Sequence, residues 1–110
     1  MDMLHPTMSD KLDEARLLLV CSATLAAEYH ARYGWTPSQP WQGQLVGGCE
    51  MLALMTGDSA LAIEADAWEN AVGSLELRAR LFADDSEEHY TAAARYAAGK
   101  AEAATRRDAG

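Results

Sequence analysis

The chain has 110 residues, a net charge of −8, and a hydrophobic fraction of 49%. The length suits one domain, and the apolar fraction is typical of a globular protein, which argues against a wholly disordered chain. The negative charge argues against nucleic acids and anionic membrane surfaces as partners, because binding to either requires clustered lysine and arginine. No stretch reaches the roughly eighteen apolar residues of a membrane-spanning helix.

The start of the chain has no basic segment followed by an apolar core, so it does not resemble a signal peptide. We expect a short disordered leader over residues 1–8 and one helical domain over residues 9–110. Both cysteines, Cys21 and Cys49, lie inside apolar runs. Without an export signal, they are expected to be reduced and buried, in a cytoplasmic protein.

The first helix is predicted over residues 9–33, with Ser9 or Asp10 as its cap. Residues 15–27 carry a single charge, that of Arg16, so apolar groups face every direction there. Such a helix is either central, with neighbours on several sides, or contributes a subunit interface. Gly34 is placed to end the helix in a left-handed turn.

The second helix is predicted over residues 40–56, because Pro40 is tolerated in a first helical turn. Its middle is apolar almost all round, with Glu50 as the one acid. Gly47 and Gly48 are adjacent, and each costs roughly 1 kcal/mol relative to alanine in a helix. We expect close approach of a neighbouring helix to compensate for this cost; a helix broken at this point is the alternative.

The third helix, over residues 59–82, is the element around which the others are predicted to pack. Gly57 ends the helix before it, and Asp58 or Ser59 can cap it. So short a junction predicts that the second and third helices lie side by side and antiparallel, or nearly so. Apolar residues recur at steps of three and four, as one helical seam requires. The seam consists of Leu61, Ala65, Trp68, Val72, Leu75, Ala79 and Phe82.

The fourth helix, predicted over residues 84–107, has an apolar seam made almost entirely of alanine. Such a helix packs closely but buries little area per residue, so its end is expected to fray. The sequence therefore predicts an all-α fold, a four-helix bundle with up-and-down or closely related topology. The first helix has more apolar faces than three neighbours can cover, which predicts a homodimer with the first or second helix at the interface.

Motifs that assemble catalytic or metal sites are missing from the sequence. There is no Glu-x-x-His of di-iron bundles, no His-Glu-x-x-His, no phosphate-binding loop and no Gly-x-Ser-x-Gly. The catalytic residues are therefore unknown, no metal or cofactor is predicted, and whether the protein is an enzyme stays open.

Glu50 is the first candidate for a functional residue, because an unpaired carboxylate in an apolar helix is costly to bury. It is either a pocket acid with a raised pKa, or a residue on an exposed edge or in a structural ion pair. If the first two helices are antiparallel neighbours, His30 or Glu28 lies near Glu50. Tyr29 would then complete a set of polar groups in an apolar pocket.

Trp35 and Trp41 flank the proline-containing first connection and are the second group of candidates. An aromatic loop at a bundle end is typical of a recognition surface or of the lip of a pocket, but it also covers helix ends. Trp68 is expected in the core. Met51 and Met55 are expected there too, although methionine also suits adaptable binding surfaces.

Two functions from different classes fit the sequence. The first is a small, acidic, non-enzymatic module that self-associates and binds a protein partner through its acidic surface or the Trp35–Trp41 loop. The alternative is a small-molecule site, with or without catalysis, between the first two helices around Glu50. A pocket beside Glu50 would favour the second function, and a filled core there with an exposed aromatic patch would favour the first.

Overall fold

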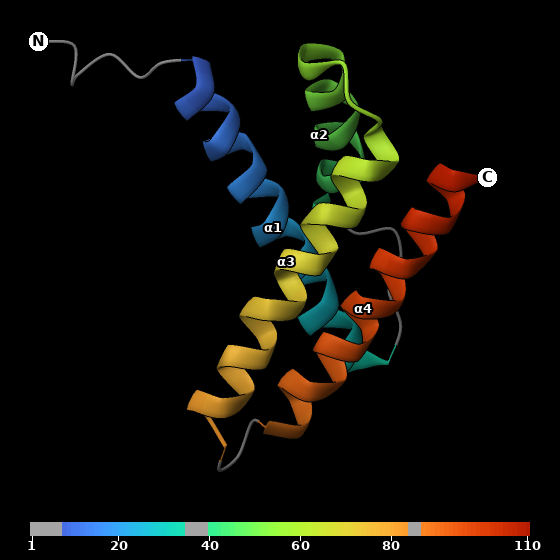
Figure 1. Ribbon diagram of the computed structural model, residues 1–110. Helices are drawn as coiled ribbons and strands as arrows, with labels where there is room; N and C mark the ends of the chain where they lie inside the picture. Colours follow the sequence, from blue (N-terminus) through green and yellow to red (C-terminus); the bar gives the residue numbers. More distant parts are fainter. Residues whose placement is uncertain (1–7, 35–39, 84–86) are drawn as a thin grey trace, which may run out of the picture.

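The structure is a computed structural model, which describes residues 8–34, 40–83 and 87–110. These residues form four α-helices and no strand (Figure 1): α1 (Met8–Tyr33), α2 (Pro40–Thr56), α3 (Ala60–Leu81) and α4 (Glu87–Ala109). The predicted all-α class is confirmed. The predicted start of the fourth helix at residue 84 and residues 1–7 of the predicted leader lie outside the described residues, whereas Met8 already belongs to α1.

Local signals fix the helix ends as predicted. Gly34 has a φ of 75° and donates its N–H to the His30 carbonyl at 2.7 Å, and Gly57 has a φ of 81° and donates to the Ala53 carbonyl at 2.8 Å. Both values lie in the left-handed region that glycine adopts at little cost. The Ser59 hydroxyl accepts an N–H from the first turn of α3 at 3.3 Å, as an N-cap does.

The four helices form an open, flattened assembly. Helices α3 and α4 run antiparallel and make the most extensive contact, and α1 passes behind both of them in Figure 1. Within the described residues, α2 contacts α1 and α3 but not α4. The principal extents are 46 × 40 × 23 Å and the radius of gyration is 14.9 Å. A compact chain of this length has a radius of gyration of about 13 Å, so the helices do not close around one another fully.

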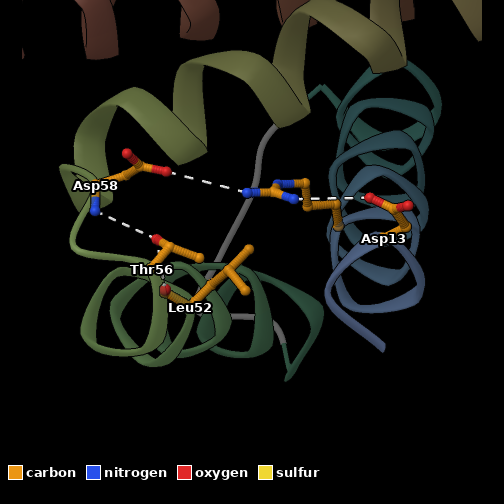
Figure 2. A network of polar contacts seen from close by, with 5 residues as sticks. Asp13, Leu52, Thr56 and Asp58 are labelled. Atoms are coloured by element: carbon orange, nitrogen blue, oxygen red, sulfur yellow. Dashed lines mark hydrogen bonds and ion pairs between the residues drawn. The ribbon is translucent and has the colours of Figure 1, made fainter. Parts of the chain in front are cut away.

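The position of α2 differs from the predicted one. Its contact with α3 is the least extensive of the five helix pairs that touch. Figure 2 shows α2 nearly end-on, with the first turns of α3 lying across it. The two helices therefore cross instead of lying side by side along their length. The short junction brings the end of α2 close to the start of α3, but it does not fix the angle between them.

The core is centred on α3 and its neighbours, and the Trp68 side chain is 3% exposed, which confirms its expected place there. Its ring meets that of Tyr96 edge-on, with 5.9 Å between centroids. The predicted seam is buried at most of its positions, but Phe82 at its end is exposed. The sequence analysis missed a second buried row on α3, which consists of Ile63, Ala67 and Ala71.

The last helix reaches further along the chain and is better anchored than predicted. Its buried residues are all alanines, as the seam indicated: Ala93, Ala94, Ala97, Ala101 and Ala104. The helix continues to Ala109, and the Ser59 hydroxyl at the start of α3 donates to the Asp108 carboxylate near its end. The expected fraying is therefore not observed. Among the described helices, none is both long and apolar enough to cross a membrane.

Candidate functional site

The main candidate site is a groove of about 460 Å³ between α1 and α2, which we call the α1–α2 groove. Its lining, among the residues that the structure describes, contains no charged side chain. From α1 come Ala15, Leu18, Leu19, Cys21, Ser22 and Leu25. From α2 come Gln44, Gly48, Met51, Leu52 and Met55. The groove therefore offers an apolar surface with a few neutral polar groups.

The floor of the groove is formed where α2 comes closest to α1. A Cβ atom placed on Gly48 would lie 2.5 Å from Leu19 Cδ2, whereas one on Gly47 would meet no atom within 4 Å. The close approach of a neighbouring helix, which was expected to compensate for the paired glycines, is thus confirmed at Gly48 and absent at Gly47. Leu19 and Leu52 are buried, at 6% and 2% exposure, and α2 continues through both glycines without a break.

The walls of the groove are exposed to an unusual degree for large apolar side chains. Leu18 and Leu25 on α1 are 62% and 53% exposed, and Met51 and Met55 on α2 are 65% and 58% exposed. Residues 18, 21 and 25 follow the steps of three and four that place side chains on one helix face. The core position expected for the two methionines is therefore wrong.

The two cysteines have different environments. Cys21 is exposed in the groove wall, so its expected burial is wrong, whereas Cys49 is buried as predicted. Burial, and then the negative charges of Glu64 and Glu50, raise the pKa of the Cys49 thiol from 9.0 to about 11. A thiol is nucleophilic only when ionised, so Cys21 is the more reactive cysteine near neutral pH.

Glu50 is exposed on α2 and does not line the groove. It precedes Met51 by one residue, which turns it about 100° around the helix, away from the groove wall. Arg16 pairs with acids other than Glu50. It lies 3.7 Å from Asp13 within α1 and 4.0 Å from Asp58, and the second contact joins α1 to the junction before α3 (Figure 2).

The structure does not bring the other predicted site residues to Glu50 in one pocket. The His30 ring stacks on Tyr96 of α4 with 4.0 Å between centroids. Tyr29 lies against Tyr33, at 4.5 Å, in a different groove. Trp35 and the side chain of Trp41 lie outside the described residues. The binding roles of all five residues stay predictions.

Comparisons with protein-family models, with curated proteins and with solved structures find no match for this chain. Across the residues that the structure describes, no group of three or more histidine, cysteine, aspartate or glutamate side chains is placed to hold a metal ion. The sequence analysis did not predict the exposed groove residues Leu18, Cys21 and Leu25 as site residues. The signal that points to them is the uncharged stretch of the first helix, which predicted a central helix or an interface.

Proposed function

We propose that the protein is a non-enzymatic helical interaction module that acts as a homodimer, with the α1–α2 groove as the contact between the two copies. The observation that carries this proposal is an exposed, apolar groove without charged residues on a chain with a net charge of −8. Surfaces of this kind on soluble proteins mark interaction sites.

The charge distribution favours a second copy as the occupant. Residues 17–27 contain no charged side chain, and α2 contains only Glu50. Two acidic chains repel each other least where such uncharged surfaces meet. A basic partner would find no opposite charge in this groove and would instead bind the acidic surface elsewhere.

The exposed apolar side chains of the groove give a second copy a surface to cover. Four large apolar residues that line the groove are more than half exposed: Leu18, Leu25, Met51 and Met55. At these fractions each exposes on the order of 100 Å², or roughly 400 Å² in all, which is about half of the roughly 800 Å² that each partner buries in a standard interface.

The alternative is a small-molecule site in the same groove. Its volume of about 460 Å³ is within the range of ligand pockets. Because the groove is uncharged and Glu50 lies outside its lining, the ligand in this case would be uncharged and apolar. The lining offers only Cys21, Ser22 and Gln44 as polar side chains, which is little for catalysis.

Sedimentation velocity on single variants tests the proposal. Leu18→Asp and Met51→Asp place a charge in the groove, and Leu77→Asp is the matched control, because Leu77 is 52% exposed on α3 and does not line the groove. We expect wild type and Leu77→Asp to be dimers at micromolar concentration and the two groove variants to be monomers with unchanged helical circular dichroism. A monomeric wild-type protein would refute self-association. A monomer that 1-decanol stabilises against heat would support the small-molecule alternative.

A further inference from the structure

A second groove, of about 280 Å³, lies between the C-terminal half of α1 and the first turn of α4. Its lining is chemically unlike that of the α1–α2 groove. From α1 come Tyr29, Arg32 and Tyr33, and from α4 come His89 and Tyr90. Three of the four tyrosines of the chain thus meet at one surface site.

The rings form a surface on which a flat molecule can stack. The Tyr29 and Tyr33 rings have centroids 4.5 Å apart and are tilted by 44°. The His89 and Tyr90 rings have centroids 5.1 Å apart, and Tyr90 is half-buried. Aromatic rings attract other rings through stacked and edge-on contacts.

Arg32 supplies a positive charge that no ion pair with another described residue neutralises. Glu28 precedes it by four residues, a spacing that normally allows an ion pair along a helix. Glu28 instead accepts a hydrogen bond from Arg78 of α3, with 3.0 Å between Oε1 and Nη1. Among the described residues no acid forms an ion pair with Arg32. Its guanidinium is therefore available for a carboxylate or phosphate, which it can hold through two parallel hydrogen bonds.

We infer that this groove binds a small aromatic anion, with its ring against the tyrosines and its acid group on Arg32. The Glu28 carboxylate also lines the groove, but Arg78 offsets its charge. Glu87 and Glu88 are exposed and do not belong to the lining. The site needs only one copy of the chain, so it does not rest on the proposed dimer, although Leu25 lines both grooves.

Titration of the full-length protein with three probes of similar size tests the inference. Benzoate, benzyl alcohol and benzylamine differ in charge and share one ring, and tyrosine side-chain NMR signals report on the site. We expect saturable benzoate binding with a Kd of about 1 mM and shifts at Tyr29, Tyr33 and Tyr90. Benzyl alcohol and benzylamine should bind at least tenfold more weakly.

Two arginine variants separate recognition of the acid group from general charge effects. Arg32→Gln should weaken benzoate binding about tenfold or more, whereas Arg95→Gln, an exposed α4 residue outside this groove, should leave it within twofold. Circular dichroism confirms that both variants fold. The inference is overturned if benzoate does not saturate below about 10 mM. It is also overturned if benzylamine binds as tightly as benzoate or if Arg32→Gln binds like wild type.

Discussion

Replacing each of the paired glycines of α2 with alanine should have opposite outcomes for the free energy of unfolding. Alanine is favoured over glycine inside a helix by about 0.8–1.0 kcal/mol. A Cβ on Gly47 meets nothing within 4 Å, so Gly47→Ala should gain this amount in full. For a chain of this size it corresponds to a rise in Tm of about 4 °C.

Gly48→Ala introduces a clash that opposes the same gain. Its Cβ would lie 2.5 Å from Leu19 Cδ2, so the Leu19 side chain must move by roughly 1 Å to reach normal contact. Leu19 is 6% exposed, so packed neighbours resist this movement, although one side of the residue lines the α1–α2 groove. Overpacking of this kind costs about 1–3 kcal/mol, so the net change should lie between about zero and a loss of 2 kcal/mol.

Urea denaturation of both variants, with Gly73→Ala on α3 as a second unhindered control, measures the difference. We expect Gly47→Ala and Gly73→Ala to shift the midpoint upward and Gly48→Ala to be less stable than Gly47→Ala by at least about 1 kcal/mol. In a Leu19→Ala background the clash is absent, so Gly48→Ala should become stabilising. Equal stability of the two single variants would refute the close approach of α1 and α2 at Gly48.

Substitutions at three other positions test the core, the buried thiol and a helix cap. Trp68→Ala should lower the free energy of unfolding, measured in urea, by about 3–5 kcal/mol. Trp68→Phe should cost clearly less, because it keeps a ring and removes an indole N–H that has no hydrogen-bond partner among the described residues. Equal losses of stability in the two variants would contradict this. The pKa of Cys49 is raised to about 11 in the folded state, so the unfolded state ionises first and stability should fall by about 2 kcal/mol as the pH rises from 9 to 11. Cys49→Ala should not show this loss of stability. Identical pH profiles of wild type and Cys49→Ala would exclude the Cys49 thiol as its cause. Ser59→Ala should cost about 1 kcal/mol in thermal unfolding, because α3 loses its N-cap; an unchanged Tm would argue against the cap.

Features set by local sequence could be predicted well. Helix ends depend on residues such as Gly34, Gly57 and Ser59, whose conformational freedom or capping ability acts within one turn. The burial of Trp68 followed from helical periodicity, because one seam on a long helix must be covered.

Features set by the approach of distant elements could not be predicted. Periodicity shows which residues share a helix face but not which face a neighbour covers, so the exposure of Cys21 and Met51 was missed. Local spacing also could not reveal that Glu28 pairs with Arg78, fifty residues away, and not with Arg32. A groove does lie between the two helices where the sequence analysis expected a pocket, but Glu50 faces away from it.

The alkylation rate of Cys21 as a function of protein concentration tests self-association through the α1–α2 groove most directly. Cys21 is exposed in the groove of a single copy, whereas Cys49 is buried and its raised pKa keeps it unreactive near neutral pH. In a dimer joined at this groove, the second copy covers Cys21. We predict that the rate falls as the concentration rises through the dimer Kd, and that Leu18→Asp keeps the fast rate throughout. A rate that is independent of concentration and equal in both proteins would contradict the account.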